Sequence, residues 1–403
     1  MSKKFTFYAL TPVFHFAFYV AISVAILSCS TKKDPNQDGS TINLTFDEAQ
    51  TGPSYLSMVD SFSFIKLDHL GKGFVSDINQ LVVHKDFFYI FDRSHHKILQ
   101  FTLNGEFRQQ LHHVGAGPEE YQSINSFQID PSKDHLIVHD SRGKKLIWFD
   151  LDFNFIKSKS IPYYFNSFHV LSETNTALMY FGNNPQYLEN SAVSFYSIGH
   201  FNLENAEPVG WHLPFEKEMA GKTFGGSANI LGDPKTPKIV RDFDPTIYQW
   251  KNDTIKPLFK LHFSRGFISK EDLYKEADFI NFIQDARKNI REISGIQQHF
   301  ETDRYLHLKY TSFHPEAFLF QSAFIDLDSH EIIHPRYEDA VFQRLTQNGN
   351  TVVHNNFLIK TVTLDLLNYM RENMAEDIAK SKVTLPDFDL ENDNPYLFIY
   401  RLK

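Results

Sequence analysis

The amino-acid sequence predicts an all-β domain, a six-bladed β-propeller built from four-stranded antiparallel blades. Two observations carry this prediction: an aromatic content of 15%, with 40 Phe and 18 Tyr, and an internal repeat with a spacing of 48 residues. Aromatic side chains favour pleated, half-buried surfaces. Four short strands that repeat every ~40–50 residues are typical of a propeller blade.

The repeat is clearest in two stretches near the start of the domain. Residues 89–107 align with residues 137–155, so that Asp92 and Asp140 lie 48 positions apart. Each stretch contains an apolar strand, a polar turn and a second apolar strand, and Asn104-Gly105 is typical of a tight hairpin turn. Because the apolar residues alternate or run in short blocks, the pattern excludes a helical solenoid.

Strand patterns that fit four further blades follow these two units. They cover residues 167–213, 246–263, 305–334 and 351–362. Between six and seven units fit residues 42–403 once two helical segments are set aside. We expect six blades, because the stretch around Gly221–Pro237 has the composition of an inserted loop.

The last strand of the sequence is expected to close the ring. Residues 396–402 are apolar and aromatic, and an unpaired strand of this kind would be an aggregation site. A propeller closes best when a strand from one terminus completes the blade that the other terminus begins. We therefore expect residues 396–402 to pair with a strand near residues 54–67.

Two segments have helical instead of strand patterns. Ser269-Lys270-Glu271-Asp272 has the form of a capping box, which predicts a helix over about residues 269–293. A second helix is predicted over about residues 364–380, with Leu367, Met370, Met374 and Ile378 along one stripe. We expect the apolar faces to pack on the rim of the propeller; the alternative is that they dock a partner.

The N-terminal segment has the organisation of a secretory signal. Lys3 and Lys4 precede a mostly apolar stretch from Phe5 to Leu27. Residues 26–29 (Ile-Leu-Ser-Cys) resemble a bacterial lipobox, which implies that Cys29 is acylated, with palmitate among its acyl groups, and becomes the mature N-terminus. An uncleaved membrane anchor and a buried core cysteine are the alternatives.

These patterns divide the chain into three parts. Residues 1–28 are predicted to be a lipoprotein signal peptide, residues 29–41 a flexible tether and residues 42–403 the propeller. Cys29 is the single cysteine, so the fold contains no internal disulfide.

Several motifs of the mature chain are similar to one family. The half-blades at residues 90–101 and 138–149 resemble NHL- and TolB-like propeller repeats. The segment Gly115-Ala116-Gly117-Pro118-Glu119-Glu120-Tyr121 is similar to the Gly-x-Gly-Pro-Gly-Glu-Tyr link of the six-bladed β-propeller lipoproteins of Bacteroidetes. Residues 61–67 and 393–402 resemble that family's first and closing strands. The resemblance implies a fold and a cell-envelope address, with no established activity.

Within this link, four residues are expected to shape the turn between blades: Gly115, Gly117, Pro118 and Tyr121. Glu119 replaces the third glycine of the family pattern, so a positive φ is not required there.

Composition and charge exclude several classes of protein. The chain is 42% hydrophobic and carries a formal charge of −9 at pH 7. It can therefore form a large core and is not disordered by composition. Binding of nucleic acid requires a basic stripe, which the sequence lacks.

The sequence contains no motif that predicts catalysis, a cofactor or a metal. Gly-x-Ser-x-Gly, P-loop and EF-hand patterns are all missing. The adjacent pairs His95-His96 and His112-His113 are not chelating units, because neighbours on a strand point to opposite faces. We therefore expect no catalytic residues, metal site or cofactor, although a zinc site assembled across blades stays open.

Two groups of residues remain as candidates for a function. Asp92 and Asp140 follow apolar strands at equivalent positions, and equivalence favours a structural turn over catalysis. The glycine-rich loop around Phe224, Gly225, Gly226 and Asn229 could line a ligand site or connect two blades.

The sequence therefore predicts a lipid-anchored binding or scaffold module of the cell envelope, with a protein, peptide or glycan as its ligand. The alternative is a propeller hydrolase or lyase with a cation in the central funnel. We expect a monomer on the outer membrane of a Gram-negative bacterium that contacts the membrane only through its lipid. The globular domain would be periplasmic or surface-exposed.

Overall fold

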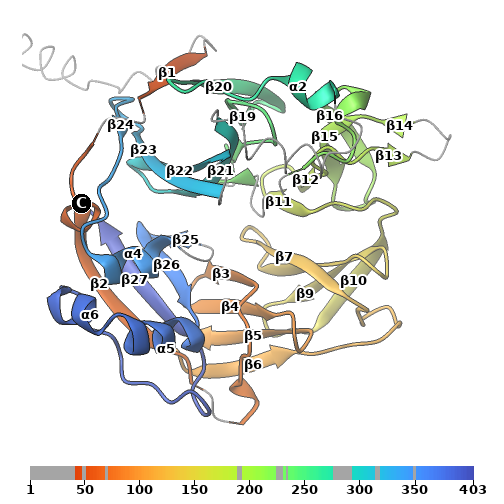
Figure 1. The fold of residues 1–403 in the computed structure, drawn as a ribbon. Coiled ribbons are helices and arrows are strands. Elements are labelled where there is room, and N and C mark those ends of the chain that lie inside the picture. Colours follow the sequence, from red (N-terminus) through yellow and green to blue (C-terminus); the bar gives the residue numbers. More distant parts are fainter. Residues whose placement is uncertain are drawn as a thin grey trace, which may run out of the picture. The chain divides into compact units, whose positions relative to one another are not determined.

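The computed structural model describes residues 41–47, 51–68, 71–187, 193–223, 230–232, 235–275, 293–313, 318–347 and 351–403. The chain divides into two compact units, Met1–Thr41 and Ile42–Lys403. The second unit is a six-bladed β-propeller, as predicted, with six small sheets arranged in a ring (Figure 1).

The first three blades follow one another in the sequence, and each is a four-stranded antiparallel sheet. The first contains β3 (Gln80–His84), β4 (Phe87–Asp92), β5 (Lys97–Thr102) and β6 (Phe107–Leu111). The second contains β7 (Ile124–Asp130), β8 (His135–Asp140), β9 (Lys145–Asp150) and β10 (Phe155–Ser160). The third contains β11 (Ser167–Leu171), β12 (Thr176–Tyr180), β15 (Tyr196–Asn202) and β16 (Pro208–Pro214), with a small hairpin of β13 (Gln186–Tyr187) and β14 (Val193–Ser194).

The last three blades include strands from both ends of the domain. The fourth contains β17 (Ile230–Leu231), β18 (Lys238–Ile239), β19 (Thr246–Lys251) and β20 (Thr254–Phe263), with β1 (Ile42–Phe46) parallel to β20 at its edge. The fifth contains β21 (Ile293–Glu301), β22 (Tyr305–Phe313), β23 (Phe318–Asp326) and β24 (Ile332–Ile333). The sixth contains β25 (Thr351–His354), β26 (Phe357–Val362), β27 (Tyr396–Leu402) and β2 (Val59–Lys66).

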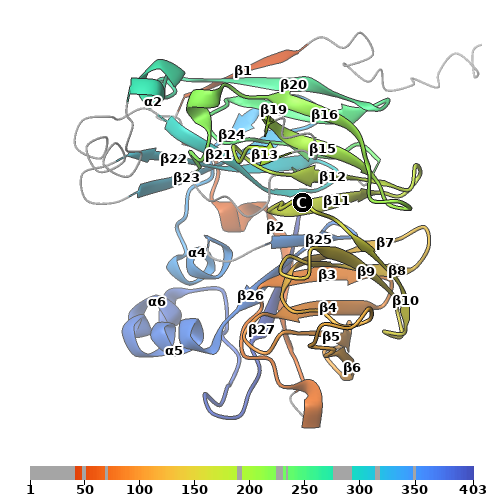
Figure 2. The same ribbon diagram turned by 90° about the vertical axis from the view of Figure 1, so that its right-hand side faces the viewer.

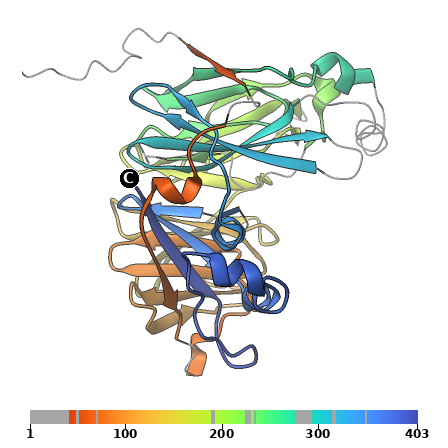
Figure 3. The same cartoon turned by 60° about the vertical axis from the view of Figure 1, so that its left-hand side comes forward.

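The predicted closure of the ring is confirmed. β27 pairs with β2 in antiparallel register from Val59↔Leu402 to Lys66↔Tyr396, and Figure 3 shows the two strands side by side. The hydroxyls of Tyr55 and Tyr400 lie 3.0 Å apart in the core behind this pair. The first and last strands of the ring therefore cover each other's edges.

The N-terminal segment also ties neighbouring blades together outside the sixth sheet. After β1 leaves the fourth blade, the Gly52 amide donates to the His334 carbonyl at 2.7 Å. The Arg336 amide donates to the Pro53 carbonyl at 2.9 Å, just before the 3₁₀ helix η1 (Tyr55–Met58). The described residues between 42 and 66 therefore make contacts along the fourth, fifth and sixth blades.

Many of the aromatic side chains pack between neighbouring blades. Buried apolar clusters lie at each of the six joints of the ring. At the joint between the first and second blades, for example, Phe91 and Phe127 belong to the same cluster. Burying a Phe side chain contributes about 1.5–3 kcal/mol, so face-to-face packing of the sheets holds the ring together.

The structure corrects the predicted strand content of the fourth and fifth blades. The stretch Gly221–Pro237 was expected to be an insertion, but it contains the innermost strand β17. Residue Ile293, expected near the end of a helix, begins the innermost strand β21. Strand propensity could not indicate β17 and β18, because each of these strands has only two residues.

The predicted helices are present in modified form. Helix α2 (Lys270–Lys275) begins where the capping box predicts, and residues 276–292 lie outside the described part of the chain. The second predicted helix is interrupted at Met374, which separates α5 (Leu364–Asn373) from α6 (Ala375–Lys380). Its stripe packs on the core of the sixth blade as expected: Leu367, Met370 and Met374 are buried there and Ile378 packs against them.

One further helix, α4 (Ala340–Gln347), was not predicted. Asp339 caps it by accepting the Phe342 amide at 2.9 Å. Helices α4, α5 and α6 lie beside the sixth blade (Figures 1 and 2). Short 3₁₀ turns complete the described elements: η2 (Gly71–Gly73) and η3 (Lys217–Met219).

Candidate functional site

The centre of the ring is a channel enclosed by the innermost strands of all six blades. β3, β7, β11, β17, β21 and β25 each contact the next strand in this order, and β25 contacts β3. They surround a cavity of about 1230 Å³. We name its two ends by topology: inner strands begin at the link face, where the chain passes between blades, and end at the hairpin face.

The wall of the channel combines polar and apolar side chains. Strands β7 and β11 and the residue before β11 contribute amide, hydroxyl and imidazole groups: Asn125, Ser126, Gln128, Asn166 and His169. The strands β3, β17 and β25 contribute aliphatic side chains, among them Val83, Leu231, Val352 and Val353. A ligand that fits this wall combines hydrogen-bonding groups with apolar surface.

Three asparagines mark the channel at the link face. Asn79, Asn125 and Asn166 stand at the beginning of β3, β7 and β11 and line the cavity. The Asn79 Oδ1 accepts the Arg93 amide at 2.7 Å, and the Asn125 Nδ2 donates to the Asn166 carbonyl at 3.1 Å. These amides are therefore partly committed to holding the rim together.

The hairpin face carries a series of polar contacts between neighbouring blades. Lysine–carboxylate pairs join the first to the second blade, the third to the fourth and the fourth to the fifth; they are Lys85–Asp134 (2.5 Å), Lys235–Glu173 (2.6 Å) and Lys238–Glu301 (2.5 Å). The Asp303 amide donates to the Asn356 Oδ1 at 3.0 Å across the joint between the fifth and sixth blades. Lys85–Asp134 and Lys235–Glu173 are exposed and contribute little stability, whereas Lys238–Glu301 is largely buried. All three pairs align neighbouring blades.

Electrostatics at this face follow from the same contacts. Hydrogen bonds from Lys85 and His84 lower the pKa of Asp134. Burial, with a smaller contribution from the positive charge of nearby His84, lowers the pKa of His354. At the joint between the sixth and first blades, His354 is therefore favoured in its neutral form.

Two buried side-chain oxygens of residues that line the channel have no hydrogen-bond partner within the described residues. They are the Ser126 Oγ on β7 and the Glu301 Oε2 on β21. The other carboxylate oxygen of Glu301 pairs with Lys238, and a Cβ at Gly232 would lie 2.6 Å from the Oε2. Glycine at this position, with φ +97°, therefore makes room for the carboxylate.

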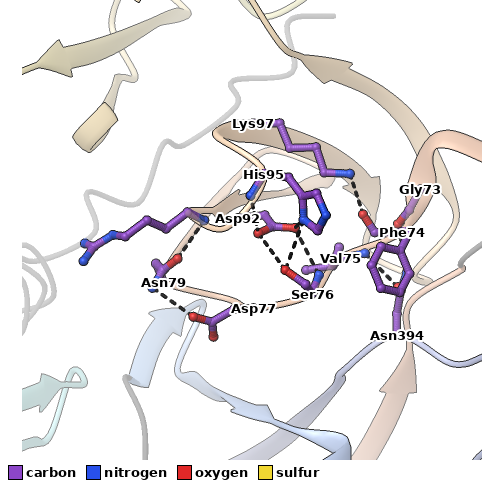
Figure 4. A network of polar contacts seen from close by, with 11 residues as sticks. Gly73, Phe74, Val75, Ser76, Asp77, Asn79, Asp92, His95, Lys97 and Asn394 are labelled. Atoms are coloured by element: carbon purple, nitrogen blue, oxygen red, sulfur yellow. Dashed lines mark hydrogen bonds and ion pairs between the residues drawn. The ribbon is translucent and has the colours of Figure 1, made fainter. Parts of the chain in front are cut away.

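Asp92 is the centre of a polar network at the link face of the first blade (Figure 4). Its fully buried carboxylate accepts the Ser76 amide (3.0 Å), the Ser76 Oγ (3.0 Å), the His95 amide (3.2 Å) and the His95 Nδ1 (2.9 Å). Ser76 Oγ also lies 3.1 Å from the same Nδ1. A catalytic Ser–His–Asp relay uses both ring nitrogens, so this trio does not have the geometry of one.

The equivalent aspartate of the second blade also accepts backbone amides. The Asp140 carboxylate accepts the amides of Gln122 (3.0 Å), Ser123 (3.0 Å) and Gly143 (2.9 Å). Gly143 stands where the first blade has His95, so the turn does not need an imidazole. The structural role of both aspartates stays a prediction.

The repeated lysines hold the chain segments that connect the blades. The Lys97 Nζ donates to the Phe74 carbonyl at 2.7 Å, and the Lys145 Nζ donates to the Gly117 carbonyl at 2.6 Å. Lys97 and Lys145 also lie 48 positions apart in the sequence. This shared spacing was a signal for a common role, but the sequence did not indicate the contact itself.

The link between the first and second blades is compact. The Gly117 amide donates to the Glu120 Oε2 at 2.7 Å, and a Cβ at Gly115 would lie 2.0 Å from the same oxygen. Pro118 is exposed within this turn. The Tyr121 hydroxyl donates to the His96 carbonyl at 2.7 Å, and burial raises the pKa of this hydroxyl.

Other predicted site residues lie outside the described part of the chain. These are the lipid-attachment candidate Cys29 and the ligand-loop candidates Phe224, Gly225, Gly226 and Asn229. Within the described residues, no three His, Cys, Asp or Glu side chains are grouped so that they could hold a metal ion. Every helix described is too short or too polar to cross a bilayer.

Comparisons with known proteins give a family and a fold. Residues 40–401 match the family described as "Domain of unknown function (DUF4934)". A protein of Bacteroides fragilis NCTC 9343, provisionally described as exported, has a TM-score of 0.71 at 20% identity over 90% of this chain and 99% of that one. A member of the DUF4221 family from Bacteroides vulgatus ATCC 8482 has a TM-score of 0.52 at 13% identity over 86% and 97%. No curated protein matches the sequence.

At these identities the two solved structures support the propeller fold alone. The predicted likeness to NHL- and TolB-like repeats is not tested by either and stays a prediction.

Proposed function

The chain belongs to the DUF4934 family, and we propose that it is a binding module of the cell envelope that takes a protein, peptide or glycan ligand at its central channel. The observation that supports this most is the cavity of about 1230 Å³ that six inner strands surround. Binding sites are typically concave and largely preformed, with a few hydrogen-bonding groups in an apolar wall. The wall of this channel has that composition.

The proposal includes a lipid anchor at Cys29. In the sequence, a basic start, an apolar stretch and a lipobox-like Ile-Leu-Ser-Cys run support it. Residues 29–41 would then tether the propeller to a membrane, which we propose to be the outer membrane, with the domain on its periplasmic or external side. A stable hold requires more than one acyl chain, as a diacylated cysteine supplies.

Replacement of the proposed lipid site is expected to shift the protein from the detergent-soluble membrane fraction toward unprocessed precursor. Cys29→Ala should remain an unprocessed precursor and lose the label of a palmitate analogue, because the thiol is the acceptor. Metabolic labelling followed by detergent fractionation measures both effects. Equal labelling of the variant and the wild type would contradict the anchor.

A variant that fills the channel mouth tests the binding proposal. Asn166 is exposed at the link face, and Trp at this position should obstruct the channel without removing a core side chain. We expect Asn166→Trp to capture at least about tenfold less ligand from envelope membranes than the wild type, because the added ring occupies the channel mouth. A tenfold loss of affinity corresponds to about 1.4 kcal/mol.

Lys159→Trp is the matched control, because it adds the same bulk to the exposed edge of β10, the outermost strand of the second blade. Quantitative mass spectrometry of the captured material compares the three proteins. Retention of the same ligand by Asn166→Trp at the wild-type level would contradict a site in the channel.

The alternative is a hydrolase or lyase with a cation in the funnel. It requires several ligands from different blades that converge at the axis. The described residues contain no such group, and the Ser76–His95–Asp92 trio lacks the geometry of a nucleophilic relay. The binding proposal is therefore the one that the geometry supports best.

A further inference from the structure

The charged side chains of the channel wall indicate the class of ligand. Resting on the proposed function, we infer that the channel takes a short peptide with free ends, whose carboxylate lies at Arg93 and whose amino group lies toward Asp303. Two observations support this. The two charges line opposite ends of one cavity, and neither has an oppositely charged partner in the described part of the chain.

Three side chains of the channel lining are charged at pH 7: Arg93, Glu301 and Asp303. The Glu301 carboxylate pairs with the Lys238 Nζ at 2.5 Å, so its charge is balanced. The Asp303 carboxylate accepts a hydrogen bond from the neutral Asn356 Nδ2. Among the described residues, neither this carboxylate nor the Arg93 guanidinium has an ion-pair partner. The lining therefore carries one unbalanced positive and one unbalanced negative charge.

These two charges stand at opposite ends of the channel. Arg93 lies in the turn between β4 and β5, at the link face, and its amide donates to the Asn79 Oδ1 of the same rim at 2.7 Å. Asp303 lies in the turn between β21 and β22, at the hairpin face. Inner strands of five to seven residues, such as β3 and β7, span ~17–23 Å. This exceeds the Debye length of about 8 Å, so the two charges do not neutralise each other.

The surroundings of Arg93 favour a carboxylate. A guanidinium binds a carboxylate or a phosphate through two parallel hydrogen bonds. One guanidinium balances the single charge of a carboxylate better than the charge of about −1.5 to −2 of a phosphate monoester. Asn166 lines the same mouth, and its side-chain amide makes no hydrogen bond to another described residue. Asp77, an acidic residue of this rim, accepts the Asn79 Nδ2 at 3.1 Å and does not line the cavity.

The opposite charge at the far end favours a peptide over an acidic glycan. A peptide with free ends carries a negative charge at its carboxyl end and a positive charge at its amino end at pH 7. An acidic glycan repeats negative charges along its length, and Asp303 would repel those at the hairpin face. Each inner strand is also the first or last strand of its sheet, so its edge presents backbone groups to an extended chain.

Equilibrium dialysis of the purified full-length protein in a nonionic detergent tests this inference. The probes are four pools of the same hexapeptides of Ala, Val, Ser and Thr: with free ends, with the carboxyl end amidated, with the amino end acetylated, and with both ends blocked. An extended hexapeptide spans ~20 Å, which matches the inner strands. Quantitative mass spectrometry measures how much of each pool is bound.

Blocking either end of the peptide should weaken binding. We expect amidation of the carboxyl end to lower the affinity at least about tenfold, which equals about 1.4 kcal/mol. Acetylation of the amino end should lower it less, about threefold, because Asn356 already occupies part of the Asp303 carboxylate.

Arg93→Gln should abolish the preference for a free carboxylate. This variant is expected to bind the free and the amidated pools equally, at the level of the amidated pool on the wild type, because the two changes remove the same interaction. Arg142→Gln is the matched control, since Arg142 is an exposed arginine in the equivalent turn of the second blade and does not line the channel. The control should keep the wild-type preference.

Asp303→Asn tests the other end of the channel. It should abolish the preference for a free amino end and leave the preference for a free carboxylate as in the wild type. Asp152→Asn is its control, because Asp152 is an exposed aspartate in a turn at the hairpin face of the second blade and is not part of the lining. This control should change neither preference.

The outcomes separate the inference from the proposal on which it rests. Peptide binding that does not depend on the end groups, or a carboxylate preference that Arg93→Gln leaves unchanged, would overturn the inference. Binding of hexagalacturonate in place of the peptides would also overturn it and, if Asn166→Trp abolishes that binding, leave the channel as the site. Failure of every probe, with an envelope ligand that Asn166→Trp no longer captures, would have the same meaning. An envelope ligand captured equally by wild type and Asn166→Trp would overturn both.

Discussion

Deletion of Pro395–Lys403 is expected to unfold the whole propeller. The deletion removes β27, which lies between β2 and β26 in the sixth blade. Five of its seven side chains are buried, and each contributes about 1.5–3 kcal/mol. Their sum is comparable to the entire net stability of a domain, about 5–15 kcal/mol. Thermal unfolding and solubility of the truncated protein measure the effect.

Arg401→Ala is the control for this deletion, because Arg401 is an exposed side chain on the same strand. The control should unfold within a few degrees of the wild type. A truncated protein that stays soluble and keeps the wild-type melting temperature would show that β27 does not close the ring.

Loss of the Asp92 carboxylate is expected to have the largest effect of any single substitution considered. Asp92→Ala removes the acceptor of four hydrogen bonds, two from backbone amides and two from side chains. We expect a loss of about 3–5 kcal/mol of unfolding free energy, because the donors are left without their partner in a partly buried site. Denaturant unfolding gives the value.

His95→Ala tests whether the stability of the turn depends on the imidazole. It removes the contacts of Nδ1 with Asp92 and Ser76 and leaves the backbone amides bound to Asp92. The second blade has glycine at this position, so the cost should be about 1 kcal/mol or less. Equal losses in the two variants would contradict a turn-stabilising role for Asp92.

Much of the fold could be predicted because the sequence is locally consistent. In the first two blades the two middle strands have apolar runs, polar turns separate them, and the 48-residue spacing repeats this pattern. The closing strand was recognisable from its apolar and aromatic residues, and the edge argument gave its partner. These signals all act over short stretches or at the termini.

The missed elements have physical reasons of their own. β17 and β18 are held by pairing and packing in a ring, since two residues are too few for a propensity signal. β21 is long, but it follows a stretch with a helical pattern. Helix α4 depends on the Asp339 cap and on contacts with the sixth blade.

The candidate site was harder to predict than the fold. Ser126 and Glu301 are 175 positions apart, and neither stands in a motif. The fold brings them into one wall through the order of the blades. The ion pairs of the hairpin face have the same origin, because Lys238 and Glu301 meet only when the fourth and fifth blades are neighbours.

Hydrogen exchange of the full-length protein, with and without its captured envelope ligand, tests the channel as the binding site most directly. Bound ligand should slow amide exchange in the inner strands, for example β7 and β11, and leave the outermost strands β6 and β10 unchanged. Slowed exchange confined to the outer strands, or to helices α5 and α6, would contradict a ligand in the channel.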